Sequence, residues 1–117
     1  MIVAQTEWVV PTEYPDLRSA NEIAIDLETR DPNLKETGSG AIAGDGEVVG
    51  IAVAVDGYKG YFPIAHGEGP NMDRKKTLDW FKDVCESPAT KIFHNAMYDV
   101  CWIRNLGIKI NGLIIDT

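Results

Sequence analysis

The chain has 117 residues, of which 44% are hydrophobic, so it can form one small globular domain with a single core but not two. Its net charge of −7 argues against a broad electrostatic grip on a nucleic-acid backbone, because such binding depends on many Lys and Arg contacts to phosphate. The charge does not exclude a nucleic-acid substrate that is held through bound metal, since such a site needs carboxylates at its centre.

The N-terminal segment and the cysteines indicate the compartment. Residues 1–10 carry one acid and no base, and no apolar run approaches the ~20 residues that span a membrane. Cys85 and Cys101 fall in separate predicted helices without the spacing of a zinc site, so we expect reduced thiols. We therefore predict a cytoplasmic protein that does not contact membrane.

The first part of the chain predicts one strand and one long loop. We expect a single domain over residues 1–117, in which 1–20 is a lead-in with one helical turn between Pro11 and Ala20. Ile23–Leu27 is a β-branched, apolar run interrupted by one acid, which is typical of a buried strand. The segment from Thr29 to Glu47 contains several glycines and no period, which predicts a long mobile loop.

The rest of the chain predicts a hairpin followed by alternating helices and strands. Val48–Val55 and Tyr58–Ile64 flank Asp56-Gly57, a dipeptide that favours a type I′ turn. Asp73–Glu86 has helical spacing and begins at an Asp cap. The remaining elements are a strand over Lys91–His94, a helix over Met97–Leu106 and an extended stretch over Ile108–Ile115.

This order of elements predicts an α/β fold. Three antiparallel strands are followed by β-α-β units, which gives a mixed five-stranded sheet with helices packed on it. The pattern is typical of a ribonuclease H-like core, here truncated at the C-terminus. Trp80, Phe81 and Trp102 have the helical spacing of core residues, and His66, at a strand end, favours a structural role.

Two acids on the first strand carry the functional argument. Alternate residues of a strand face the same side, so Asp26 and Glu28 project together while Ile25 and Leu27 face the other way. Two like charges held close repel and lose hydration, and a divalent cation would reverse that cost. The alternative is that Glu28 is exposed at the strand end and Asp26 caps a turn.

A third acid strengthens the metal hypothesis. Asp99 begins a stripe continued by Trp102, Ile103 and Leu106, the helix face expected to lie against the sheet. On its own, Asp99 is better explained by the positive end of its helix, with Asn95 as the cap, or by a hydrogen bond to a neighbour. Together with Asp26 and Glu28, it favours a metal site.

The sequence resembles the DEDD superfamily of 3′–5′ exonucleases. Ile23–Thr29 resembles the first exonuclease motif, Asp-x-Glu-Thr, and His94–Asp99 resembles the second, Asn followed four residues later by Asp. Over about residues 20–117, including Gly60–His66 and Leu106–Thr117, the chain is most similar to proofreading domains of A-family DNA polymerases. The stretch Thr29–Leu34 resembles phage-encoded members, whose compartment would be the host cytoplasm.

The resemblance implies a two-metal site with Mg²⁺ or Mn²⁺. Asp26 would ligate both ions, Glu28 the ion on the nucleophile side and Asp99 the other. Asn95 and Thr29 would bind the substrate, a role that for Asn95 is compatible with capping the helix.

The family's third motif, a Tyr or His shortly before a last Asp, has no match after Asp99. Asp116 is the only later acid, and we expect it to be a helix cap cut off from its helix. We therefore expect an N-terminal fragment of the domain that binds metal weakly and is inactive alone, with a polymerase domain in the same parent chain. Uncovered apolar surface would favour a homodimer.

The function expected is proofreading, the removal of a terminal nucleotide from the 3′ end of single-stranded DNA. One alternative is a ribonuclease D-like RNA-processing exonuclease, because that family shares both motifs and no residue here identifies the 2′-hydroxyl. Another alternative is a non-catalytic scaffold that keeps the fold.

Overall fold

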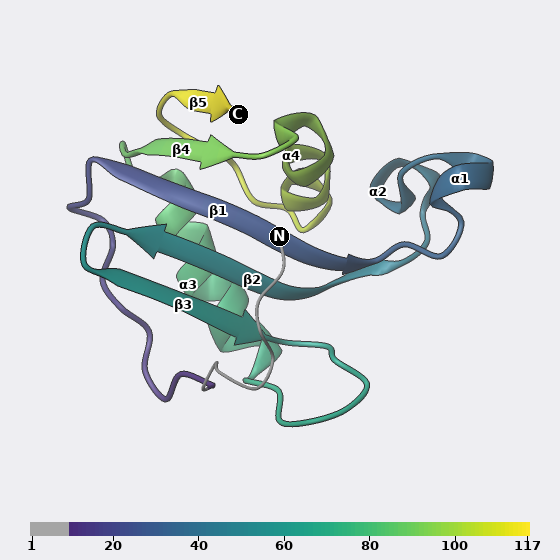
Figure 1. Ribbon diagram of the computed structural model, residues 1–117, viewed down its shortest axis with the longest axis horizontal. Coiled ribbons are helices and arrows are strands. Elements are labelled where there is room, and N and C mark those ends of the chain that lie inside the picture. The colour runs from purple at the N-terminus through teal and green to yellow at the C-terminus, as the bar shows by residue number, and fades with distance from the viewer. Residues whose placement is uncertain (1–9) are drawn as a thin grey trace.

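The computed structural model describes residues 10–117, which form one five-stranded sheet with helices beside it (Figure 1). In chain order the elements are β1 (Glu22–Arg30), α1 (Leu34–Thr37), α2 (Gly40–Ala43), β2 (Glu47–Val55), β3 (Tyr58–Pro63), α3 (Arg74–Glu86), β4 (Thr90–Phe93), α4 (Ala96–Asn105) and β5 (Ile114–Asp116). The lead-in predicted over residues 1–9 lies outside the described part of the chain. Between residues 10 and 117, no helix is long and apolar enough to cross a membrane.

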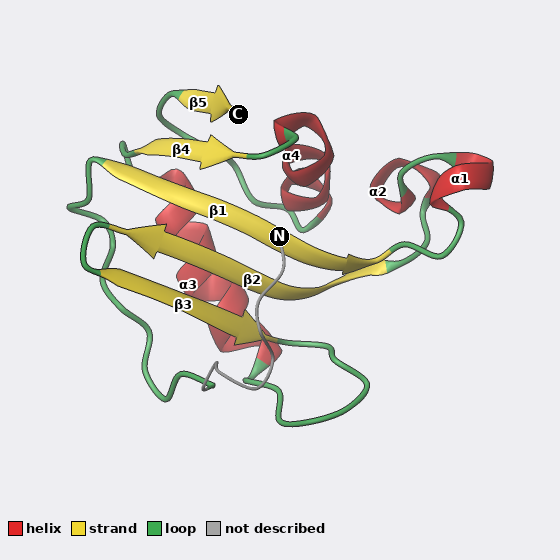
Figure 2. Cartoon of the chain, viewed as in Figure 1, coloured by secondary structure: helices red, strands yellow, loops and turns green. Residues whose placement is uncertain are grey.

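The sheet is mixed, as the sequence predicted. Its strand order is β3-β2-β1-β4-β5. β1, β2 and β3 are paired antiparallel, whereas β4 runs parallel to β1 and to β5. Antiparallel neighbours can be joined by a short turn, but parallel strands need a crossover, and α3 and α4 supply the two crossovers (Figure 2).

The β2–β3 hairpin is confirmed, but the predicted turn type is wrong. A type I′ turn needs positive φ at both central residues. Gly57 has φ of 83°, which meets this requirement. Asp56 does not meet it, because among the non-glycine residues of the described range only Asn95 has positive φ. The glycine alone supplies the conformation that closes Val55 against Tyr58.

The core lies between one face of the sheet and α3. Along β1, buried side chains alternate with half-buried ones, which is the pattern of a strand with one covered face. Burial raises the pKa of the Cys85 thiol in α3 to about 12, and both Cys85 and Cys101 are free thiols, as expected. The buried residues of β1 and α3 are Ile23, Ile25, Leu27, Thr77, Phe81, Val84 and Cys85.

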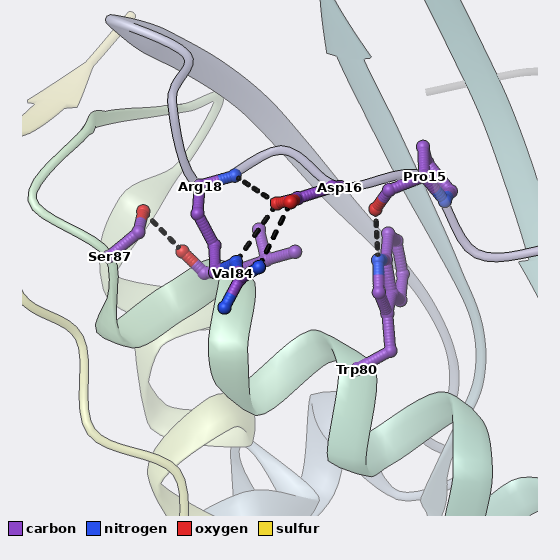
Figure 3. A network of polar contacts seen from close by, with 6 residues as sticks. All are labelled: Pro15, Asp16, Arg18, Trp80, Val84 and Ser87. Atoms are coloured by element: carbon purple, nitrogen blue, oxygen red, sulfur yellow. Dashed lines mark hydrogen bonds and ion pairs between the residues drawn. The ribbon is translucent and has the colours of Figure 1, made fainter.

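The described part of the lead-in packs on this core and contains one hydrogen-bonded turn within the predicted range, in which the amide of Ala20 donates to the carbonyl of Leu17 at 3.1 Å. Trp80 of α3 donates its Nε1–H to the carbonyl of Pro15 at 2.7 Å (Figure 3). Tyr14 stacks on Phe62 with ring centroids 5.9 Å apart, and Leu17 is 5% exposed. Trp80 is therefore a packing residue, as its spacing predicted.

The segment between β1 and β2 is not the structureless loop predicted from its glycines. It contains α1 and α2, each of four residues, and two side chains of α4 form hydrogen bonds to it. Tyr98 donates its hydroxyl to Asp31 Oδ2 at 2.7 Å, and Asn105 donates its side-chain amide to the Ala41 carbonyl at 3.2 Å. The segment is thus attached to the helix that carries Asp99.

The chain between α4 and β5 is largely irregular. The sequence predicted an extended stretch over Ile108–Ile115, but the strand covers only Ile114–Asp116. Lys91 of β4 holds this region. Its buried ammonium donates to the carbonyl of Ser87 and to that of Asn111 at 2.8 Å, and burial lowers its pKa. The contact with Asn111 holds the segment before β5 beside β4.

Candidate active site

β1 presents two carboxylates on the face opposite the core. Asp26 and Glu28 are half-buried and alternate with the buried side chains of the strand. Their register partners on β2 are Ala52 and Gly50, so no large β2 side chain stands directly beside either acid. The pairing shifts between Glu28 and Thr29, an irregularity of the kind often found beside active sites.

Asp99 reaches the same stretch of β1 from the first turn of α4. β4 pairs with β1 only over Glu22–Ala24, and α4 follows β4 next to the later part of β1 (Figure 1). A hydrogen bond from the backbone of Leu27, which lies between the two β1 acids, lowers the pKa of Asp99. The third acid is therefore not separated from the first two by the sheet.

The Asp99 carboxylate is buried, and one of its oxygens is unsatisfied. The residue is 4% exposed, and its Oδ2 has no hydrogen-bond partner among residues 10–117. A buried charged oxygen without a partner is costly, because it has lost water without a compensating contact. Such a group favours either a proton or a cation.

The three carboxylates share one electrostatic environment. Burial, followed by the charge of Asp26 and more weakly by that of Glu28, raises the pKa of Asp99 to about 7. Burial, and then the charge of Asp26, also raises the pKa of Glu28, whereas His66 lowers it. The charge of Asp26 thus acts on both other acids, and that of Glu28 acts on Asp99, which is the arrangement of an anionic site that can attract a divalent cation.

The donor set fits a hard cation, although the side chains do not form a closed cage. Within the described range, no three His, Cys, Asp or Glu side chains are grouped tightly enough to hold an ion as they stand. Carboxylates that repel one another are expected to keep apart. Their oxygens, including the unsatisfied Oδ2 of Asp99, are the ligand type that Mg²⁺ and Mn²⁺ prefer.

Asn95 does not cap α4, so that part of the prediction is wrong. It has φ of 63° and ψ of 60°, its side chain makes no cap hydrogen bond, and the residue is exposed. The cap comes from Asp116, whose Oδ1 accepts the amides of Asn95 at 3.0 Å and Ala96 at 3.2 Å. Asp116 was expected to have lost its helix, but the helix that it caps precedes it in the chain.

Thr29 connects the two elements that carry the acids. Its Oγ1 lies 2.9 Å from the hydroxyl of Tyr98, the residue before Asp99. Because Tyr98 donates its one hydroxyl proton to Asp31, its oxygen accepts from Thr29. The last residue of the first motif and the last but one of the second are thus hydrogen-bonded directly.

Comparison with known proteins finds a relative in sequence and neighbours in structure. No protein-family model matches the chain. It is 37% identical over 114 residues to a DNA-directed DNA polymerase of Pseudomonas phage M6, with 89% of this chain and 16% of the polymerase covered. NrnC of Brucella melitensis has a TM-score of 0.55 at 17% identity, with 86% of this chain and 43% of NrnC covered, a likeness of fold.

Both motifs, the mixed sheet and the polymerase relative agree with the resemblance found in the sequence. The chain is similar in sequence to part of a phage DNA polymerase, and both of its motifs resemble those of the DEDD exonucleases. Its fold is the ribonuclease H-like fold that the order of elements predicted. The chain spans 16% of the length of the phage polymerase that it matches.

The site has two further residues that spacing did not reveal, Tyr61 and His66. A Cβ on Gly50 would lie 1.9 Å from the Tyr61 hydroxyl, so the Tyr61 ring crosses β2 above the glycine that pairs with Glu28. The hydroxyl lies 2.5 Å from His66 Nε2, and burial and the charge of Glu28 raise the pKa of Tyr61. The one available signal was that both residues fall within Gly60–His66, a stretch that carries the family resemblance.

The loop after β3 fixes His66 in place. Asn71 accepts the backbone amide of His66 at 2.8 Å and donates to its carbonyl at 3.0 Å. Arg30, the last residue of β1, donates to the carbonyl of Ala65 at 3.1 Å. These contacts hold His66 in place, in keeping with the structural role expected at a strand end, and its charge acts on Glu28.

Proposed function

We propose that this chain is the front part of a metal-dependent 3′–5′ exonuclease domain of a DNA polymerase, acting on the 3′ end of single-stranded DNA. The observation that carries the proposal is the buried, unsatisfied Oδ2 of Asp99 in the field of Asp26 and Glu28. The phage polymerase relative supports a place in a longer polymerase chain. The superfamily resemblance supports the direction of cleavage.

In this proposal, Asp26, Glu28 and Asp99 hold two divalent cations, Mg²⁺ or Mn²⁺. As the resemblance implies, Asp26 would ligate both ions, Glu28 the ion on the nucleophile side and Asp99 the other. When bound, the cations supply a water of lowered pKa and neutralise the charge that develops on the leaving 3′ oxygen. The carboxylates contribute the negative field that concentrates cations there.

The neighbouring residues position the reacting groups. Asn95 is exposed at the start of α4, where its side chain is available to contact the terminal nucleotide. Thr29 links β1 to α4 through its hydrogen bond with Tyr98 and, as the resemblance implies, would contact the substrate. Tyr61, whose hydroxyl contacts His66, limits the orientations open to Glu28 by filling the space above Gly50.

The chain alone is expected to bind metal weakly and to cleave slowly. No Tyr or His follows Asp99 in these 117 residues, so the pair that makes the superfamily's third motif is not among them. Asp116 does not substitute for its acid, because its Oδ1 is engaged by the first amides of α4. The proposed cleavage is therefore an activity of the longer polymerase.

Metal binding by the present chain tests the proposal first. Mn²⁺ should raise the melting temperature of the wild type, and Asp26→Ala should remove that shift while leaving the metal-free protein folded. A matched control is Asp79→Ala, which changes an exposed acid of α3 that pairs with Lys75. Equal Mn²⁺ shifts in the wild type and Asp26→Ala would contradict the proposal and favour a non-catalytic scaffold.

Substrate class is tested in the longer polymerase chain with 5′-labelled DNA and RNA oligonucleotides of the same sequence. The proposal predicts that the DNA strand is shortened stepwise from its 3′ end in the presence of Mg²⁺. Faster shortening of the RNA strand would favour a ribonuclease D-like function instead.

A further inference from the structure

The turn between β4 and α4 is held in a conformation that most residues avoid. Asn95 lies in the left-handed region, with φ of 63° and ψ of 60°. Asn tolerates this region better than most residues, but it still disfavours it relative to glycine. A strained residue of this kind persists only where the surrounding contacts hold it.

The contacts that hold the turn come from Asp116. Its Oδ1 accepts the amide of Asn95 at 3.0 Å and that of Ala96 at 3.2 Å. Both amides belong to the start of a helix, where backbone donors lack intrahelical partners and a negative charge is favourable. One carboxylate therefore satisfies two amides on either side of the left-handed residue.

Asp116 is itself fixed by the main chain of β5. It stands opposite Phe93 in the parallel pairing of β5 with β4. Thr117 donates its amide to the Phe93 carbonyl at 2.8 Å, and its hydroxyl donates to the same oxygen at 3.2 Å. The carboxylate is thus brought to the end of β4 by sheet pairing, which is more rigid than a long exposed side chain.

The turn at Asn95 sets where Asp99 points. The carbonyl of Asn95 accepts the amides of Tyr98 at 3.2 Å and Asp99 at 3.5 Å, so the first turn of α4 is built directly on it. We infer that Asp116 is a positioning residue of the candidate active site, which holds the turn at Asn95 and thereby places Asp99 beside the two acids of β1. The inference rests on the proposed function, since it assigns Asp116 to the same metal-binding site.

The experiment is a set of Mn²⁺ dissociation constants measured by calorimetry on the full chain. Asp116→Ala should weaken Mn²⁺ binding by about 10- to 100-fold, the usual effect of removing a group that orients a metal ligand. Asp116→Asn keeps an acceptor oxygen and should recover most of the affinity. In an Asn95→Gly background, where glycine adopts positive φ without strain, Asp116→Ala should weaken binding by a much smaller factor.

Asp73→Ala is the matched control, because Asp73 also caps a helix, α3, by accepting the Lys76 amide at 2.9 Å. That variant should lower stability but leave the Mn²⁺ dissociation constant within about twofold of the wild type. The inference is overturned if Asp116→Ala binds Mn²⁺ as tightly as the wild type, or if Asp73→Ala weakens binding equally.

Urea unfolding of the metal-free variants separates this inference from the proposed function. If the wild type itself does not bind Mn²⁺, the proposed function fails. The effects of Asp116→Ala and Asn95→Gly on unfolding then decide whether Asp116 holds the turn. Coupled effects support that role, and additive effects contradict it.

Discussion

The starts of α3 and α4 solve the same problem in different ways. α3 is capped by the residue before it, Asp73, which has φ of −60° and accepts an amide within the first turn. α4 follows a left-handed Asn95 and takes its cap from Asp116, which is 21 positions further along the chain. A local cap serves stability, whereas a strained turn held from a distance is expected where the position of one side chain matters.

The largest contrast between the two helices is expected in catalysis. In the longer polymerase, Asp99→Asn on α4 should lower the rate of cleavage of single-stranded DNA by at least roughly 100-fold, because it removes a charged ligand from the site. Asp79→Asn on α3 should leave the rate within about twofold, since exposed ion pairs contribute little. Single-turnover cleavage assays at saturating Mg²⁺ measure both, and similar rates for the two variants would remove the distinction.

The pH dependence of stability gives the next contrast. The pKa of Asp99 is raised from its ordinary value of 3.8 to about 7, so between these values the folded state binds a proton that the unfolded state has released. The stability that this group contributes is therefore complete below about pH 4 and is lost as the pH rises toward 7.

Asp99→Asn removes this loss, because an amide does not titrate. In urea unfolding without metal, the free energy of unfolding of the variant should rise relative to that of the wild type by up to a few kcal/mol between pH 5 and pH 8. Asp79→Asn should show no such pH-dependent gain. A constant difference between Asp99→Asn and the wild type across this range would show that Asp99 has an ordinary pKa.

The sequence predicted those structural features that depend on residues close together in the chain. The alternation around Asp26, the β2–β3 hairpin and the cap at Asp73 follow from neighbours in the chain, and all three were predicted. The attachment of residues 31–46 to α4 was not, because it depends on hydrogen bonds to Tyr98 and Asn105.

The same reason explains what was missed at the site. The spacing of Asp26, Glu28 and Asp99 predicted which face of the strand or helix each acid lies on, because strands and helices have fixed periods. It could not show that Asp116 caps an earlier helix or that Tyr61 passes above Gly50, since both depend on strand pairing between distant segments.

A smaller effect is expected from Gly50→Ala. The added Cβ would lie 1.9 Å from the Tyr61 hydroxyl and would force the ring away from its place beside Glu28, with a loss of about 1–3 kcal/mol of stability. Gly67→Ala is the matched control, because its Cβ would meet nothing within 4 Å. Urea unfolding of both variants measures the difference, and equal stabilities would mean that Tyr61 does not occupy this space.

The smallest effect is expected from removing the hydroxyl of a tyrosine, either Tyr98 on α4 or Tyr14, which contacts α3. Tyr98→Phe removes the hydrogen bonds to Thr29 and Asp31, and Tyr14→Phe removes the 2.7 Å contact with Thr77 of α3. Each should cost about 1 kcal/mol. Only Tyr98→Phe should speed proteolysis between residues 31 and 46, and equal digestion of both variants would show that Tyr98 does not hold this segment.

The most direct test is an NMR titration of the Asp99 carboxyl carbon with and without Mg²⁺. The carboxyl should titrate near pH 7 in the metal-free chain, and saturating Mg²⁺ should move its midpoint down by more than one pH unit, because a bound cation favours the charged form. A midpoint near pH 4 that Mg²⁺ leaves unchanged would show that the three acids do not form a common cation site.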